Sequence, residues 1–369
     1  MRSEPIFSSE ELQANQVRLS KLVSLIKSGD AILMAGAGSS GSLFPAWGKF
    51  IEELENEAKQ KNKEFNEGKD DFLVFADKVK ECLGEDEYYA LIYRTFQPGE
   101  RTHEQFHEVL CGLPFKAITT TNYDFVLESA LNVVTPYPNN SLHFEGTTKP
   151  KIHQFLLSLN HNNNIPKRIA HLHGVCDEPD SIILGGKEYM SKYGFSLSSG
   201  DSTLYDEIKN GSVTKEKFHE LLFQYGYEWP IRRKLLWSLL ATRRIFFVGF
   251  SLKDPYFIKM LDFVKSDLST YHAETHFLLL RITPAVAEES KIFSRDLKAK
   301  YGIVTVFYEE GDEIYTGLGN FVTELASMVG VSDIISLLPK NKESEMDVGD
   351  EQLTDELFSL SNKQIRNEN

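Results

Sequence analysis

The chain has 369 residues, of which 41% are hydrophobic and 25% are charged, and its formal net charge is -14. A chain of this length and hydrophobic content can bury a large core, so the composition excludes a disordered or fibrous protein. The negative net charge disfavours strong, direct binding of nucleic acid, because phosphate contacts require a basic surface. The length fits either one large domain with insertions or two domains.

The cysteines and the apolar segments indicate the compartment. Cys82, Cys111 and Cys176 lie far apart and form no Cys-x-x-Cys motif, so we expect neither a disulfide framework nor a zinc site built from cysteines. The N-terminal segment lacks the apolar stretch of a secretory signal, and no charge-free apolar run is long enough to span a bilayer. The sequence therefore predicts a soluble, cytoplasmic protein with no membrane contact and no bound metal.

The first third of the chain is predicted to contain one strand among helices. Ser8 and Glu11 have the spacing of a capping box and Gly29 is a typical helix stop, so a helix is expected between Ser8 and Gly29. The apolar strand Ala31–Ala35 follows directly. A charged, mostly helical stretch then covers residues 50–97.

The later predicted strands are short and apolar, and they alternate with helical patterns. This alternation predicts an α/β fold with a mainly parallel sheet and helices on both faces. We expect a single domain over residues 1–335, with helical insertions at about 50–97 and 203–244, and an acidic, disordered tail at 341–369. A loop-rich passage is expected up to about residue 166. The strand candidates are FKAITTTNYD, RIAHLHG, SIILGGKEY, RIFFVGFSLKDP, THFLLLRI and GIVTVFY.

Three glycines follow the first strand with the spacing of a dinucleotide-binding turn. Gly36, Gly38 and Gly41 stand between the strand and a predicted helix, where small residues let backbone N–H groups approach a pyrophosphate and the helix N-terminus favours it. The alternative is a tight turn without a ligand. A dehydrogenase would carry an acidic residue at a strand end about 20 residues later. A charged helix is predicted there instead, which disfavours hydride transfer.

Polar residues also follow the next strands, so four strand ends point to one crevice. Asn122 and Asp124 stand after the second strand, although an Asx turn and a helix cap would use the same residues. Alternation along a strand would place His171 and His173 on one face, as in a metal pair, but no third ligand is apparent. Gly174 lets the chain turn away, which favours His173 as the functional histidine and His171 as a structural one.

The segment VGFSLKDP is the fourth strand end. Gly249 and Ser251 within it suit contact with a ribose or phosphate, and a plain strand and turn is the alternative. Cys176 has no partner motif, and we expect it in the core.

Taken in order, GAGSS, TTNYD, LHG and VGFSLKD resemble the motif series of the sirtuin (silent information regulator) family, and the resemblance covers residues 28–307. PAWGKFIEEL and IILGGKEY are typical in form of a bacterial sirtuin-like branch found in anti-phage defence. The Asp-Phe-Arg pattern of sirtuin deacylases is absent after the glycines. Three scattered cysteines also cannot supply the four zinc ligands of the deacylase small domain, which disfavours protein deacylation.

The resemblance implies a Rossmann-like fold that binds NAD as its substrate. It implies two catalytic residues: Asn122 orients the water or substrate beside the nicotinamide ribose, and His173 is the general base. Asp124 would lie near the nicotinamide carboxamide. The residues that it implies for the pyrophosphate are Gly36, Ala37, Gly38 and Ser39, and those for the adenosine side are Gly249 and Ser251.

The same residues suit cleavage of NAD on chemical grounds. Nicotinamide in NAD is already a cationic leaving group, so the reaction needs a carboxamide to place the nucleophile, a dry pocket and a base near its ordinary pKa of ~6.5. We therefore expect an NAD+ glycohydrolase that acts in bacterial antiviral defence by depleting NAD. The alternatives are an NAD-dependent deacylase or ADP-ribosyltransferase, and a non-catalytic subunit that binds NAD or ADP-ribose.

Regulation is expected to come from outside the chain. An NADase that is always active would kill its host, so we expect a homo-oligomer or a partner that restrains it. The resemblance implies a HerA-type ATPase as that partner.

Overall fold

The structure is a computed structural model, and it describes residues 6–69, 71–135, 141–142, 149–160, 167–193, 230–252, 254–268, 274–310 and 316–331. The predicted tail at 341–369 and most of the predicted insertion at 203–244 lie outside the described residues. The division into one domain with insertions stays a prediction.

Within the described part of the chain, seven parallel strands form one sheet in the order β3-β4-β2-β1-β5-β6-β7. The strands are β1 (Ala31–Ala35), β2 (Ala117–Thr120), β3 (Ser141–Leu142), β4 (Ile169–His171), β5 (Arg244–Val248), β6 (His276–Ile282) and β7 (Ile303–Glu309). All five residues of β1 are buried, as expected for a parallel strand that is covered on both faces. The predicted α/β fold with a parallel sheet is confirmed.

Strand β1 lies at the centre of the sheet and positions the site. It pairs with β2 through Ile32 and Ala117, and with β5 through Ile32 and Ile245. The chain goes from β1 to β2 and β4 on one side, and returns to β5, β6 and β7 on the other. The strand order therefore reverses at β1, which is where ligands bind in open α/β sheets.

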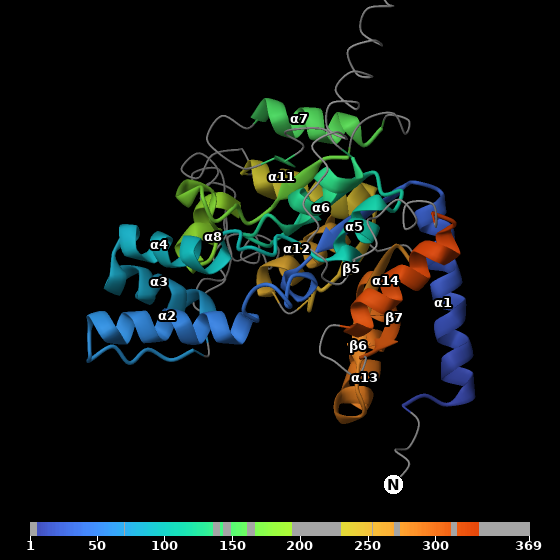
Figure 1. Cartoon of the computed structure of the whole chain (residues 1–369), viewed down its shortest axis with the longest axis horizontal. Coiled ribbons are helices and arrows are strands. Elements are labelled where there is room, and N and C mark those ends of the chain that lie inside the picture. Colours follow the sequence, from blue (N-terminus) through green and yellow to red (C-terminus); the bar gives the residue numbers. More distant parts are fainter. Residues whose placement is uncertain are drawn as a thin grey trace, which may run out of the picture. The chain divides into compact units, whose positions relative to one another are not determined.

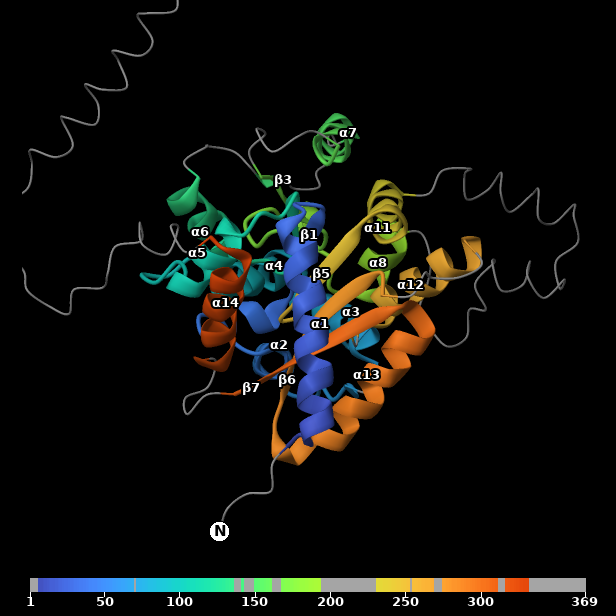
Figure 2. The same cartoon turned by 90° about the vertical axis from the view of Figure 1, so that its right-hand side faces the viewer.

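Helices cover both faces of the sheet (Figure 2). On one side α1 (Ser9–Lys27), α5 (Gln105–Gly112), α6 (Val126–Val134) and α14 (Thr316–Val329) contact one another in series. On the other side α7 (Lys149–Ser158), α11 (Ile231–Thr242), α12 (Pro255–Asp267) and α13 (Ala287–Tyr301) share one core with inward side chains of the strands. Helix α1 begins with the predicted capping box of Ser8 and Glu11.

Three helices between β1 and β2 confirm the mostly helical stretch predicted at 50–97. They are α2 (Trp47–Lys61), α3 (Phe72–Leu83) and α4 (Glu85–Phe96), and they lie side by side in Figure 1. Their core also includes Tyr123, Cys176, Ile182 and Leu184, which come from the loops after β2 and β4. These helices therefore pack directly against the loops at the site end of the sheet.

The segment SIILGGKEY is not a strand, so that prediction was wrong. A 3₁₀ turn at Pro179–Ser181 precedes it, and α8 (Gly186–Tyr193) begins at the second glycine. Its backbone groups bond outside any sheet: the Ile183 carbonyl accepts from the Tyr123 hydroxyl at 2.6 Å, and Leu184 N–H donates to Glu188 Oε2 at 2.7 Å. These bonds satisfy the backbone polar groups of this buried, apolar segment, so it needs no neighbouring strand.

Two further elements were not predicted. The passage expected to be loop contains α7 and the two-residue strand β3. The helix predicted after the glycines is present as α2, which begins at Trp47 as expected; a three-residue 3₁₀ turn at Ala37–Ser39 follows β1 directly. A helix N-terminus immediately after the glycines, as the dinucleotide-binding pattern predicts, is therefore not formed.

No helix among the described residues is long and apolar enough to cross a membrane.

Candidate functional site

The loops after β1, β2, β4 and β5 meet at one edge of the sheet because these four strands are adjacent and parallel. Gly36 N–H donates to the Val248 carbonyl of β5 at 2.9 Å. On the other side, the side-chain nitrogen Nδ2 of Asn122 donates to the Gly36 carbonyl at 3.3 Å. The structure thus brings together the strand ends that the sequence predicts to share one crevice.

The glycines of the first loop allow its close contact with the loop after β5. Gly38 N–H donates to the Gly249 carbonyl at 2.9 Å. A Cβ at Gly36 would lie 2.7 Å from that carbonyl oxygen, and a Cβ at Gly249, whose φ is 63°, would lie 2.1 Å from the Ser39 nitrogen. Glycine is needed here for packing between loops, whatever ligand they hold. Ala37 and Gly38 are the exposed residues of this loop, although Gly38 N–H is already bonded to Gly249.

A buried histidine of α5 holds this loop from behind. His107 Nδ1 accepts from Glu104 N–H at 3.0 Å, so its Nε2 carries the proton and donates to the Ser39 carbonyl at 2.7 Å. Burial lowers the pKa of His107 to about 4, which keeps the ring neutral in this tautomer. Ser39 itself is 1% exposed, so its place in the loop is fixed by the protein.

The carboxamide of Asn122 is held by its nitrogen and leaves its oxygen for another partner. Asn122 Nδ2 donates to the Gly36 carbonyl at 3.3 Å and to Ser40 Oγ at 3.1 Å. The residue is 7% exposed, and Oδ1 has no hydrogen-bond partner among the described residues. A buried, unpartnered amide oxygen is costly. It is therefore a candidate acceptor for a hydroxyl or water of a bound substrate.

Asp124 precedes α6 and is also buried. Its Oδ1 accepts from Val126 N–H, two residues on, at 3.1 Å, so the Asx-turn interpretation of this residue agrees with the structure. Burial raises the pKa of Asp124 to about 6, while the bonds from Val126 and the Ser40 hydroxyl oppose the shift. Ser40 was not singled out in the sequence, although it contacts both Asn122 and Asp124.

His173 lies beyond the end of β4, buried beside two tyrosine rings. It is 7% exposed, and the rings of Tyr189 and Tyr193 meet its imidazole edge-on at 5.4 and 6.2 Å between centroids. Its Nε2 lies 4.0 Å from Asp254 Oδ2, an oxygen that accepts from the Tyr189 hydroxyl at 2.9 Å.

The pKa of His173 differs from the ordinary value assumed from the sequence. Burial lowers it to about 4, and Asp254 only partly opposes this effect. The imidazole is therefore neutral at pH 7 and able to accept a proton, but it is a weaker base than an exposed histidine.

Gly174 and a buried arginine fix the turn after His173. Gly174 has φ 86°, and a Cβ there would lie 2.2 Å from the Ser181 carbonyl oxygen. Arg232 of α11 is 2% exposed and donates to the carbonyls of Leu172 at 3.1 Å and Ser181 at 2.7 Å. The predicted turn at Gly174 is thus present, and Arg232 holds both of its sides.

His171 is the last residue of β4 and faces a different set of residues. Its Nε2 lies 2.5 Å from Glu128 Oε1 of α6, and its Nδ1 lies 3.0 Å from the Asn122 carbonyl. Because β4 ends at His171, strand alternation does not extend to His173, and the basis for a metal pair on one face is lost. Among the described residues no group of three or more His, Cys, Asp or Glu side chains is arranged to hold a metal ion.

The loop after β5 lies next to the glycine loop, which it contacts through Gly249. Ser251 is exposed, whereas Leu252 is 2% exposed and has a positive φ of 51°. Backbone conformations of this kind are costly for residues other than glycine and concentrate at functional sites. Asp254 follows and accepts from Phe257 N–H at 3.2 Å, which anchors the start of α12.

The sequence patterns singled out none of Glu128, Tyr189, Arg232 and Asp254. Three of them lie within helices and one precedes a helix. Tyr189 and Asp254 stand inside quoted motifs, SIILGGKEY and VGFSLKDP, and that position was the only available signal.

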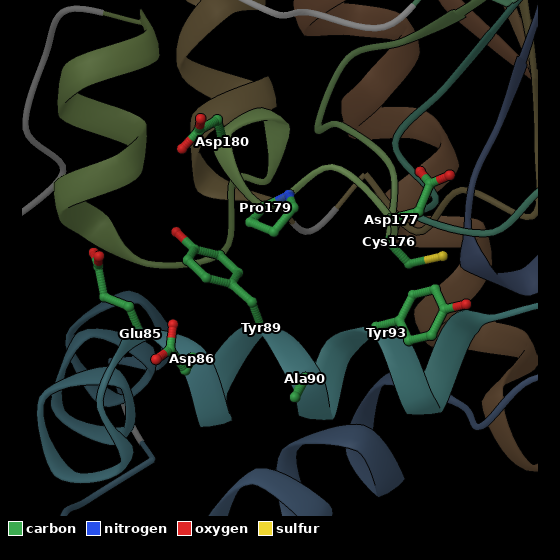
Figure 3. Close-up of a pocket in the computed structure, with 9 residues that line it drawn as sticks. All are labelled: Glu85, Asp86, Tyr89, Ala90, Tyr93, Cys176, Asp177, Pro179 and Asp180. Atoms are coloured by element: carbon green, nitrogen blue, oxygen red, sulfur yellow. The ribbon is translucent and has the colours of Figure 1, made fainter.

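A separate cavity of about 420 Å³ lies between α4 and the loop that follows His173 (Figure 3). Tyr89 and Tyr93 project from α4 toward that loop. Four carboxylates line the cavity, so it is unfavourable for a pyrophosphate. Burial raises the pKa of the Cys176 thiol to about 12, which excludes a reactive thiolate there. The lining residues are Glu85, Asp86, Tyr89, Ala90, Tyr93, Cys176, Asp177, Pro179 and Asp180.

Comparison with known proteins identifies the family. The model of the SIR2-like domain matches residues 116–306, which is more than half of the chain. The comparison with curated proteins gave no match. SIR2-like domains are typically NAD-dependent enzymes, so the match indicates an activity that involves NAD. The chain belongs to the SIR2-like domain family.

Proposed function

We propose that the protein is an NAD+ glycohydrolase, which converts NAD+ and water to nicotinamide and ADP-ribose. The observation that carries the proposal is the Asn122 carboxamide. Its nitrogen is occupied by Gly36 and Ser40, and its buried Oδ1 has no partner among the described residues. In the proposed reaction this oxygen accepts a hydrogen bond from the attacking water and holds it beside the nicotinamide ribose.

The surroundings of this oxygen suit the chemistry. The C–N bond to nicotinamide breaks with its electron pair going to the cationic ring, so the leaving group needs no acid. The remaining ribosyl cation is captured by water, whose proton passes to a base. His173 is neutral at pH 7 because its pKa is about 4, and it lies after β4, the strand next to β2 and Asn122. We assign the general base to His173.

The glycine loop supplies the binding part of the site. Ala37 and Gly38 are exposed, and the Ser39 carbonyl next to them is held by His107. We propose that Gly36, Ala37, Gly38 and Ser39 contact the pyrophosphate, Asp124 the nicotinamide carboxamide, and Gly249 and Ser251 the adenosine side.

The test is nicotinamide release from NAD+ by the purified protein, with and without an acylated peptide. We expect release without peptide. His173→Ala and Asn122→Ala should each reduce kcat by ~10²- to 10⁴-fold, the usual cost of losing a base or a positioning group. NAD+ binding measured by calorimetry should change little. His103→Ala is the matched control, because His103 pairs with Glu108 at 2.8 Å near the start of α5, and it should retain full activity.

Three outcomes would contradict the proposal. Release that requires the peptide would support a deacylase or transferase. Tight NAD+ binding without turnover would indicate a binding subunit. Full activity in Asn122→Ala would exclude the assigned mechanism.

The biological role proposed with this activity is depletion of NAD in bacterial antiviral defence. Unrestrained NAD+ hydrolysis would harm the host, so we propose a homo-oligomer whose activity is low alone and rises with a partner, a HerA-type ATPase. Light scattering and the nicotinamide assay, with and without that partner, test this role. A monomer that is fully active alone would contradict it.

A further inference from the structure

The buried pair of Glu128 and His171 contacts the backbone of Asn122. Glu128 lies on α6 and His171 ends β4, and both flank the loop that follows β2. His171 is fully buried, its Nε2 lies 2.5 Å from Glu128 Oε1, and its Nδ1 lies 3.0 Å from the Asn122 carbonyl oxygen. Neither Glu128 nor His171 has a part in the proposed chemistry.

The two neighbours of the imidazole determine where its protons are. A backbone carbonyl can only accept, so Nδ1 must carry a proton. Glu128, as a carboxylate, accepts a hydrogen bond from a second N–H at Nε2. Burial alone would lower the pKa of His171, but the charge of Glu128 and its hydrogen bond outweigh burial and raise it. Asp124 acts in the same direction. The raised pKa of His171 favours the imidazolium form, in which Nδ1–H donates to the Asn122 carbonyl and Nε2–H to Glu128.

This bond completes the restraint of Asn122. On the amide side, Asn122 N–H donates to Thr120 Oγ1 at 3.0 Å. On the carbonyl side, His171 Nδ1 holds the oxygen. The side-chain nitrogen is bound to Gly36 and Ser40. Together these bonds restrain the backbone and the side-chain nitrogen of Asn122, and they thereby limit where its carboxamide oxygen can lie.

We infer that Glu128 and His171 are positioning residues that fix Asn122, so that its carboxamide oxygen is held where the substrate needs it. The inference rests on the proposed function, because its kinetic consequence is measured on NAD+ hydrolysis. Loss of the pair should reduce kcat and leave KM little changed, because the pair does not touch the glycine loop that would bind the pyrophosphate.

Two substitutions of Glu128 separate positioning from packing. Glu128→Gln keeps the shape, and its amide N–H₂ can donate to Nε2 of a neutral imidazole, which then retains the proton on Nδ1. Glu128→Leu has similar bulk but offers no hydrogen bond. We expect kcat of Glu128→Gln within about threefold of the wild type. Glu128→Leu should lose about 10- to 100-fold in kcat, with KM changed less than about threefold.

The dependence of kcat on pH distinguishes positioning from a purely structural role, because a purely structural role would leave this dependence unchanged. In the wild type, deprotonation of His171 at high pH leaves a neutral ring whose single proton is drawn to the carboxylate. Nδ1 then no longer donates to Asn122, and kcat should fall. In Glu128→Gln the neutral ring already carries its proton on Nδ1, so this fall at high pH should be absent.

The matched control is the second histidine–glutamate pair, His103 and Glu108, whose Nε2 and Oε1 atoms are 2.8 Å apart. Glu108→Leu should leave kcat and its pH profile unchanged. The inference is overturned if Glu128→Gln and Glu128→Leu lose the same activity, if KM rises in proportion to the loss of kcat, or if the high-pH fall persists in Glu128→Gln.

A measurement without turnover separates this inference from the proposed function. Nitrogen-15 NMR of histidine-labelled protein should show both His171 nitrogens protonated at pH 7, and only Nδ1 protonated in Glu128→Gln. This result would stand even if the protein did not hydrolyse NAD+, and then only the proposed function would fail. It also remains decisive if Glu128→Leu does not fold. A wild-type ring protonated only on Nε2 would overturn the inference whatever the activity.

Discussion

The buried position of His173 leads to a prediction about acid pH. An exposed histidine with the ordinary pKa of 6.5 would be about three-quarters protonated at pH 6 and would lose its function as a base. In the structure burial lowers the pKa of His173 to about 4, so only about 1% is protonated at pH 6. The change from 6.5 to about 4 corresponds to roughly 3 kcal/mol in favour of the neutral ring.

The base is active when neutral, so activity is lost only as the pH falls through the pKa of the folded protein. We therefore expect kcat/KM at pH 6 to remain above about 90% of its value at pH 8, where an unperturbed histidine would leave about a quarter. The assay is nicotinamide release between pH 5 and 8.5, with circular dichroism at each pH to confirm that the chain stays folded.

Asp124 has to be separated from His173 in this experiment, because its pKa of about 6 lies inside the range tested. Asp124→Asn removes that titration and keeps an oxygen that can accept from Val126 N–H. The profile of this variant, scaled to its own value at pH 8, should remain flat to pH 6. A midpoint near 6.5 in Asp124→Asn would refute the reasoning, since it would mean that the base is a histidine exposed to water.

Two further predictions concern the loops and the metal. Gly249→Ala places a Cβ 2.1 Å from the Ser39 nitrogen at a φ of 63°, and should destabilise the protein by more than about 3 kcal/mol in urea unfolding and weaken NAD+ binding. Gly330→Ala, at φ 88° with no atom within 4 Å, should cost only about 1 kcal/mol, and equal losses in the two variants would contradict the close approach of the loops. Elemental analysis should find no stoichiometric zinc, because Cys111 and Cys176 are buried and no four-ligand cluster is expected from three cysteines. One tightly bound zinc per chain would restore the deacylase as a candidate.

The strand ends could be predicted from the sequence because each signal there is local. The strand Ala31–Ala35 is apolar throughout and runs into glycines, and the same change from apolar to polar marks the ends of β2, β4 and β5. Parallel pairing then places these ends together without further information. The candidate residues Gly36, Asn122, His173 and Gly249 all follow from this argument.

The residues that tune the site could not be predicted in this way. Three of these residues lie within a helix or just before one: Glu128, Arg232 and Asp254. Their partners at the site are 43 to 81 residues away along the chain. The wrong prediction of a strand around Ile183 also results from a partner that is distant along the chain. Its apolar pattern correctly indicated burial, but the Tyr123 hydroxyl, 60 residues away along the chain, and the Glu188 carboxylate of the following helix satisfy its backbone.

A base with a pKa of about 4 is weak for most hydrolytic reactions, in which the nucleophile must be deprotonated before it attacks. Cleavage of NAD+ makes a smaller demand. Departure of neutral nicotinamide leaves a ribosyl cation, and a water that bonds to this cation becomes strongly acidic as the bond forms. Its proton can pass to a weak base late in the reaction. The packing that lowers the pKa of His173 also leaves the residue only 7% exposed, and a reaction centre shielded from bulk water would favour capture by the one water that Asn122 would hold. The low pKa and the burial are therefore two results of the same packing, and both suit the hydrolysis of a cationic glycoside better than the hydrolysis of an amide.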